Sequence, residues 1–275
     1  MLCEILLVNR SSYYKWINRK ETNEEKLNHE LSQIILEYYR ESKGILGYRR
    51  MTLWVNRRQQ TSYNIKRIRR LMRLMGISSV IRRKRYNYIK SKPEVTAENV
   101  LNRNFEASKP NEKWLTDVTE FKVIGSNQKL YLSAILDLFD KSIISYKLGT
   151  SNNNHLVFQT FDEAIKEHPQ AKPLVHSDRG YQYTSKVFKN KLISQEINQS
   201  MSRVGRCIDN GPMEGFWGII KSEMYYLNQF KDIKSLRLAI EQYIKFYNES
   251  RYQMKLKGLT PIEYRNQTLN LQQFN

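Results

Sequence analysis

Apolar residues recur along this chain with two different periods, and the change of period divides it. Over residues 1–90 they return every three or four positions, and the sets are Leu31, Ile34, Ile35 and Tyr38, then Tyr48, Met51 and Val55, then Ile65, Ile68, Met72 and Met75. This is the period of amphipathic α-helices. Asn64 and Gly76 bound the third helix, and Ser11 or Ser12 is a candidate cap for a shorter helix near the start. We therefore predict a small all-helical domain of helix-turn-helix type over 1–90.

From Trp114 the pattern becomes that of β-strands. The expected strands are 114–124, 130–138 and 142–148, the first two separated by the hairpin signal Gly125-Ser126-Asn127. Helices and strands then alternate: a helix near 155–167, a strand ending at Asp178, a helix at 185–193, a strand near 197–201 and a long helix from about Pro212. This order predicts an α/β domain over 112–230, a mixed sheet with helices on both faces.

Two flanking segments complete the predicted organisation. Residues 91–111 lose the period and contain two prolines, so we expect a linker. A last apolar set predicts a C-terminal helical extension over 231–275 that packs on the α/β domain; its members are Leu236, Ile240, Tyr243, Ile244 and Tyr247.

The excess of positive charge predicts a polyanionic partner. The formal net charge is +19, and residues 42–93 hold 16 Lys or Arg without a single Asp or Glu. A merely solvated face would normally mix both signs, so this excess favours nucleic acid, and less strongly an anionic membrane surface. Arg69 and Arg73 on the third helix are candidate DNA-reading residues. Arg82, Arg83, Lys84 and Arg85 are candidate phosphate contacts.

Composition also excludes several classes. No apolar run is long enough for a membrane span, and the stretch Ile5–Val8 is too short for a signal sequence. Two cysteines and four histidines show no zinc-ligand spacing, and two cysteines do not make a disulfide framework. We expect a cytoplasmic protein.

Three acidic residues stand where a metal site would need them. Asp117 lies inside a predicted strand, Asp178 at a strand tip and Glu214 in the first turn of a helix. Carboxylates suit Mg²⁺, and three of them can bind two ions if the fold gathers them. Taken singly, each acid is also explained as a surface residue. Asp137, Asp140 and Asp209 are explained locally, as turn or capping residues.

The segments around these acids carry a family resemblance. Trp114–Thr119, His176–Tyr183 and Met201–Glu214 resemble the DDE transposases of bacterial insertion sequences, and in particular the OrfB protein of the IS three family. The segment Tyr243–Asn248, with Arg251 and Leu259–Tyr264, resembles the C-terminal signature of that family. Ile208, Gly211 and Gly215 depart from its commonest pattern, but none of them is an acidic ligand. The resemblance implies a retroviral-integrase-like, RNase H-like catalytic core.

The resemblance also implies roles for individual residues. Asp117 would bridge two Mg²⁺ ions, for which Mn²⁺ is expected to substitute, and Asp178 and Glu214 would each complete one side. Lys221 would touch the terminal phosphate or base of the DNA. His176, two residues before Asp178, would lie on the same face of the strand and contact substrate, or be a structural histidine; both interpretations remain open.

The implied activity is cleavage of DNA at the terminal inverted repeats of a mobile element and joining of the 3′-hydroxyl to target DNA. The implied partners are DNA, further copies of the chain assembled on it, and the upstream-frame OrfA protein, as a fusion or a binding partner. The alternatives are a non-catalytic DNA-binding regulator derived from a transposase and an RNase H-like nuclease that uses only water. The three acids argue against the first, and the basic helical domain argues against the second.

Overall fold

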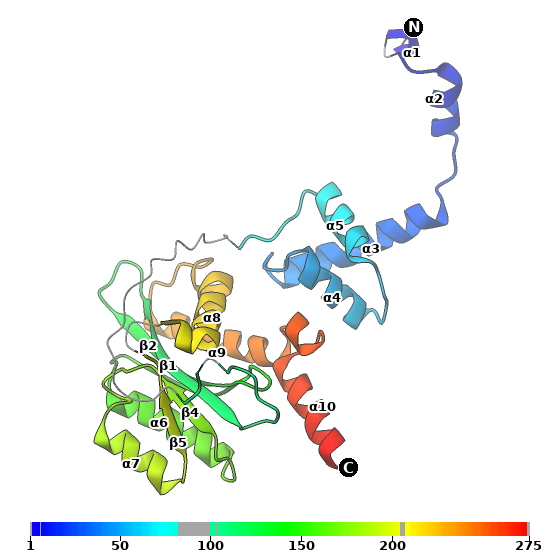
Figure 1. Ribbon diagram of the computed structural model, residues 1–275. Helices are drawn as coiled ribbons and strands as arrows, with labels where there is room; N and C mark the ends of the chain where they lie inside the picture. Colours follow the sequence, from blue (N-terminus) through cyan, green and yellow to red (C-terminus); the bar gives the residue numbers. More distant parts are fainter. Residues whose placement is uncertain (1, 6, 82–99, 103, 204–206, 274–275) are drawn as a thin grey trace. The chain divides into compact units, whose positions relative to one another are not determined.

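The computed structural model describes residues 2–5, 7–81, 100–102, 104–203 and 207–273 (Figure 1). The chain divides into two compact units, Met1–Val80 and Ile81–Asn275. Each unit has its own buried apolar residues, and each is described by itself.

The first unit is helical, as predicted. Two short helices, α1 (Leu2–Ile5) and α2 (Arg10–Ile17), precede α3 (Asn23–Glu41), α4 (Tyr48–Arg58) and α5 (Ile65–Leu74). The predicted cap of α2 was wrong, because the side chain of Asn9 accepts from the N–H groups of Ser11 and Ser12. α3, α4 and α5 pack together through the apolar positions expected from the sequence, including Leu31, Ile35, Met51, Val55, Ile68 and Met72.

The second unit is built on a five-stranded mixed sheet, which confirms the predicted fold class. Its strands are β1 (Lys113–Lys122), β2 (Lys129–Asp137), β3 (Ile143–Gly149), β4 (Leu174–Ser177) and β5 (Asn198–Met201). The order is β3-β2-β1-β4-β5. β1, β2 and β3 pair antiparallel, whereas β4 pairs parallel with β1 and with β5. β1 therefore lies in the middle of the sheet.

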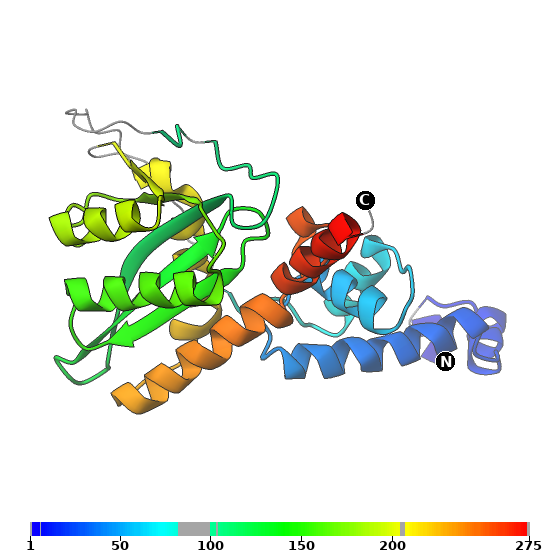
Figure 2. The ribbon, with the colours of Figure 1, turned by 90° about the horizontal axis from the view of Figure 1, so that it is seen from below.

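Helices cover both faces of this sheet. α6 (Asn154–Glu167) and α7 (Lys186–Ser194) lie across one face (Figure 2), where Phe158 and Phe161 contact Phe188. α8 (Gly211–Ile220) and α9 (Ile233–Glu249) pack on the other face. Side chains alternate along β1. Trp114 therefore packs in the apolar layer under α6 and α7, and Leu115 packs in the layer under α8 and α9.

The C-terminal part differs from the expectation in two respects. The long helix expected from Pro212 changes at Lys221 into a π-helical turn, Lys221–Tyr225, although Met213, Trp217, Ile220 and Met224 are buried as predicted. Past α9 the chain forms a further helix that the apolar pattern did not predict, α10 (Pro261–Gln273). Short 3₁₀ turns precede α8 and α10 at Cys207–Asn210 and Met254–Leu256.

The described part of the expected linker belongs to the second unit. Leu101 is 2% exposed and its N–H donates to Ser200 Oγ over 3.0 Å. Phe105 and Ala107 pack against the apolar layer beneath α8 and α9. The parts of the predicted linker at 100–102 and 104–111 therefore contact the second unit, and the linker over 91–111 stays a prediction. Among the described residues, no helix is long and apolar enough to cross a membrane.

Candidate active site

The parallel pairing of β1 with β4 places two acids beside each other. The last aligned pair of this ladder is Thr116 with Ser177. The next residue on each strand is an acid, Asp117 on β1 and Asp178 directly after β4. Neighbouring strands lie about 4.8 Å apart, so the register itself makes Asp117 and Asp178 neighbours at this end of the β1–β4 ladder.

The third acid comes from α8, which packs against β1. Glu214 lies in the first turn of this helix, after Pro212, where the helix dipole favours a negative charge. Trp217 follows three residues later, on the same side of the helix. Its indole Nε1–H donates to Asp117 Oδ2 over 3.0 Å, so the side of α8 that carries Glu214 faces Asp117.

The carboxylate of Asp117 is buried and feels the charge of the other two acids. The pKa of Asp117 is raised to about 6, first because the group is buried and then because of the negative charge of Asp178, with a smaller contribution from Glu214. Hydrogen bonds from Trp217 and from the N–H of Val118 oppose this rise. Asp117 is half-buried, whereas Asp178 and Glu214 are exposed. The site is therefore a patch of negative charge that is open to solvent on a basic protein.

Protein groups already hold two of these carboxylates. Asp117 Oδ1 accepts from the N–H of Val118 over 2.8 Å, and Asp178 Oδ1 accepts from the N–H of Gly180 over 2.8 Å. A Cβ on Gly180 would lie 2.9 Å from Gln182 Oε1 and 3.1 Å from Asp178 Oδ1. A side chain at position 180 would therefore press on the carboxylate of Asp178 that the Gly180 N–H now holds.

The donor set around these acids fits a hard divalent cation. The side chain of Asn210 is 4% exposed, and its Oδ1 has no hydrogen-bond partner within the described part of the chain. Its amide nitrogen lies 3.5 Å from the carbonyl of Thr116, the residue before Asp117. Carboxylate and amide oxygens are the ligands that Mg²⁺ prefers. No three His, Cys, Asp or Glu side chains of the described chain stand in a ready-made metal-binding arrangement. The assignment of the three acids to one metal site therefore stays a prediction.

His176 lies in the interior of the second unit. It is 0% exposed, and its ring nitrogens lie 2.9 Å from Ser200 Oγ and 3.0 Å from Ser202 Oγ. Burial lowers its pKa to about 4, so the ring is neutral. Of the two interpretations left open by the sequence, this placement favours the structural histidine and does not support a DNA contact.

Lys221 lies at the start of the π-helical turn, and its Nζ lies 5.5 Å from the centre of the Phe121 ring. The side chain is half-buried. The sequence analysis predicted that Lys221, seven residues after Glu214, lies on the same edge of one helix. The α-helix continues to Ile220, so the two residues are still about two helical turns apart. Its contact with DNA stays a prediction.

The acids set aside in the sequence have turn roles, but they also do more. Asp137 and Asp140 accept from the N–H groups of Phe139 and Ser142, as expected of turn residues. Both are fully buried, and Arg265 of α10 donates to them over 3.1 and 2.8 Å. Asp209 is buried and paired with Arg203. These acids are therefore structural anchors, which the sequence did not reveal.

The predicted DNA-reading residues are only partly within the described chain. Arg69 and Arg73 are both exposed on α5, opposite its buried Ile68, Leu71 and Met72, although Arg69 stacks over Tyr48 at 5.2 Å. Lys66 and Arg70 share this outward face and were missed, although the helical period would have found them. Arg82, Arg83, Lys84 and Arg85 lie outside the described residues.

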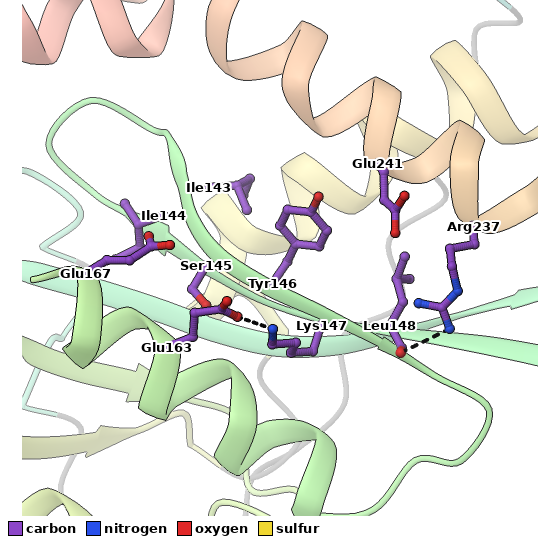
Figure 3. Close-up of a pocket in the computed structure, with 10 residues that line it drawn as sticks. All are labelled: Ile143, Ile144, Ser145, Tyr146, Lys147, Leu148, Glu163, Glu167, Arg237 and Glu241. Carbon is purple, nitrogen blue, oxygen red and sulfur yellow. Dashed lines mark hydrogen bonds and ion pairs between the residues drawn. The ribbon is translucent and has the colours of Figure 1, made fainter.

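A hollow of about 350 Å³ lies elsewhere in the second unit (Figure 3). It is lined by β3, α6 and α9, where Lys147 pairs with Glu163 and Arg237 donates to the carbonyl of Leu148. None of the three candidate acids lines it.

Known proteins share both units. Residues 107–207 and 214–269 match two family models described as integrase core domain, and 26–85 match an HTH-like domain. The chain is 43% identical to the "Putative transposase InsK for insertion sequence element IS150" of Escherichia coli, over 95% of this chain and 91% of that protein. It is 27% identical to the "Transposase InsF for insertion sequence IS3A" of the same organism, over 98% and 94%. The solved intasome of simian T-cell lymphotropic virus with a PP2A regulatory subunit is similar in fold, with a TM-score of 0.50 and 16% identity over 84% of this chain and 74% of that one.

Proposed function

This chain belongs to the transposases of bacterial insertion sequences, and from that premise we propose that Asp117, Asp178 and Glu214 form a DDE site for two Mg²⁺ ions. The enzyme is a polynucleotidyl transferase that acts on the DNA ends of its element. In strand transfer, the 3′-hydroxyl oxygen of the element attacks a target phosphorus. A new phosphodiester bond forms, and the target's own 3′-oxygen leaves and takes up a proton.

The chain's own groups have distinct tasks in this proposal. Two bound Mg²⁺ ions would activate the attacking oxygen and stabilise the leaving one. Asp117 suits the bridging position, because each of its oxygens accepts one hydrogen bond and keeps a lone pair. Asp178 and Glu214 are exposed, so a DNA strand can reach them. Lys221, on the edge of the helix that carries Glu214, would hold the terminal phosphate or base.

One observation carries the proposal: the β1–β4 register sets Asp117 beside Asp178. The pKa of Asp117 is raised first by burial and then by the charges of Asp178 and, to a smaller extent, Glu214. Like charges held together destabilise the protein on their own. A bound divalent cation reverses that effect, which is why such clusters are typical of functional sites.

The test is DNA strand joining by Asp117→Asn, Asp178→Asn and Glu214→Gln. Each variant should lose joining at least about 10³-fold in Mg²⁺ or Mn²⁺ while it binds terminal-repeat DNA as the wild type does. Glu120→Gln is the matched control, because Glu120 lies on the same strand as Asp117 but is paired with Lys129. Near-normal joining by one of the three variants would remove that residue from the site. Cleavage without any joining by the wild type would favour the RNase H-like nuclease.

The first unit supplies the end-binding function in this proposal. The outward face of α5 carries Lys66, Arg70 and Arg73, and the positive charge of such a helix suits the major groove. Several copies would assemble on the two ends of the element. The upstream-frame OrfA protein would join this assembly as a fusion or a separate chain, and DNA binding would keep the enzyme on the nucleoid.

A further inference from the structure

Trp217 has an unusual acceptor for a buried indole. Its side chain is 7% exposed and packs in the apolar layer of α8 and α9, next to Phe216. A buried indole N–H needs an acceptor, and a backbone carbonyl would satisfy it. Here the acceptor is instead Oδ2 of Asp117, at 3.0 Å. The contact joins residues 100 positions apart in the chain.

The geometry of this contact limits what Asp117 can do. Indole is a neutral donor that cannot accept, so its direction is fixed: N–H to carboxylate oxygen. The second oxygen is fixed by the N–H of Val118. With one protein hydrogen bond on each oxygen, the carboxylate is held at both ends, and each oxygen keeps a lone pair for a cation.

The same contact fixes α8 against the sheet. Glu214 and Trp217 are one helical turn apart, so a hydrogen bond from Trp217 to β1 sets the rotation of the helix that carries Glu214. Phenylalanine would fill most of the same volume without supplying the N–H. Trp217→Phe therefore removes the hydrogen bond and keeps most of the packing.

We propose that Trp217 is a positioning residue of the metal site, which orients Asp117 and places Glu214 through one indole hydrogen bond. The proposal rests on the function proposed above, because it assumes that these acids bind the cation. Groups behind metal ligands typically change metal affinity by about 10- to 100-fold when removed. It follows that loss of the indole N–H should weaken metal binding without removing a ligand.

The experiment measures binding of Mn²⁺ alone to the full chain, from the electron paramagnetic resonance signal of the free ion. Trp217→Phe should raise the dissociation constant roughly 10-fold. Trp114→Phe is the matched control, since Trp114 is a fully buried indole that donates to neutral Asn111 at 3.3 Å. It should bind Mn²⁺ within about twofold of the wild type. Strand joining by Trp217→Phe should recover when Mn²⁺ is raised, a change in metal requirement and not in maximal rate.

Trp217→His separates the hydrogen bond from packing. Its Nε2 occupies the place of the indole Nε1, but the ring fills less of the apolar layer. We expect the Trp217→His variant to unfold at a lower temperature than the Trp217→Phe variant and yet to bind Mn²⁺ more tightly. Equal binding by the two variants, or a wild-type dissociation constant in Trp217→Phe, would overturn the proposal. Asp117→Asn distinguishes the premise: if it binds Mn²⁺ like the wild type, the proposed metal site itself fails.

Discussion

Asp117 carries a charge that destabilises the folded, metal-free protein, and this cost can be measured. Its pKa is about 6 in the folded protein, against roughly 3.9 in an unfolded chain. An acid whose folded pKa is raised contributes stability in its protonated form. That contribution is complete below about pH 4 and is lost as the pH rises through about 6. The full shift corresponds to roughly 2.9 kcal/mol at 1.36 kcal/mol for each pKa unit. Because Asp117 is only half-buried, we expect about 1–2 kcal/mol.

The perturbation is Asp117→Asn, which removes the charge and keeps the shape. Guanidinium unfolding would be followed by tryptophan fluorescence in EDTA from pH 4 to 8. With Trp16 and Trp54 replaced by Phe, the remaining tryptophans, Trp114 and Trp217, both report on the second unit. The unfolding free energy of the Asn variant, relative to its Asp parent, should grow by about 1–2 kcal/mol between pH 4 and pH 8. Mg²⁺ at pH 8 should then stabilise the parent and leave the variant unchanged.

Glu120→Gln is the control for this measurement, since it removes an acid from the same strand whose side chain is 40% exposed and paired with Lys129. The difference in unfolding free energy between Glu120→Gln and the parent should change less over this pH range than that of Asp117→Asn. A pH-independent difference for Asp117→Asn would refute the reasoning, because the carboxylate would then be perturbed neither by its burial nor by the charges of Asp178 and Glu214. A stabilising effect of Mg²⁺ on the Asn variant equal to that on the parent would place the cation elsewhere.

Three further predictions follow from named contacts. Arg265→Met should cost roughly 3–5 kcal/mol of unfolding free energy, measured by chemical denaturation, because it leaves Asp137 and Asp140 buried without the Arg265 guanidinium. Arg19→Met, which removes a solvent-exposed pair with Glu25, should cost far less. Gly180→Ala should reduce strand joining at least about tenfold with unchanged DNA binding in a gel-shift assay, since its Cβ would press on Asp178 Oδ1; unchanged joining would show that Asp178 need not fold back. Lys66→Ala with Arg70→Ala should lower affinity for terminal-repeat DNA and reduce the salt slope by about 0.9 for each lost phosphate contact; a wild-type salt series would exclude this face of α5 from DNA.

The sequence predicted those parts of the structure that depend on local period. The three packed helices of the first unit, the mixed sheet and the positions of Asp117 and Asp178 on their strands follow from apolar spacing and turn residues. The π-helical turn at Lys221 did not follow, because the apolar stripe Met213, Trp217, Ile220 and Met224 satisfies a continuous α-helix equally well. α10 was missed because its apolar positions do not form one stripe.

Contacts between distant segments were beyond such reasoning. Arg265 reaches Asp137 across 128 positions, and no local pattern distinguishes these acids from ordinary turn residues. For His176, strand alternation predicted which face of the strand it lies on. It did not predict the contacts of its ring with Ser200 and Ser202. The partner of a side chain depends on register between strands, which the sequence of one strand does not state.

Three different contacts hold the three acids in place. Strand register fixes Asp117 beside Asp178, the Gly180 turn holds the carboxylate of Asp178, and the indole of Trp217 joins α8 to β1. None of these contacts supplies positive charge, so none neutralises the cluster. The backbone N–H groups and the indole orient the carboxylates but leave their repulsion in place: after burial, the charge of Asp178 is the next cause of the raised pKa of Asp117. Acids that are oriented but not neutralised keep their affinity for a cation. An Arg in the place of Trp217 would instead form an ion pair with Asp117, as Arg265 does with Asp137 and Asp140.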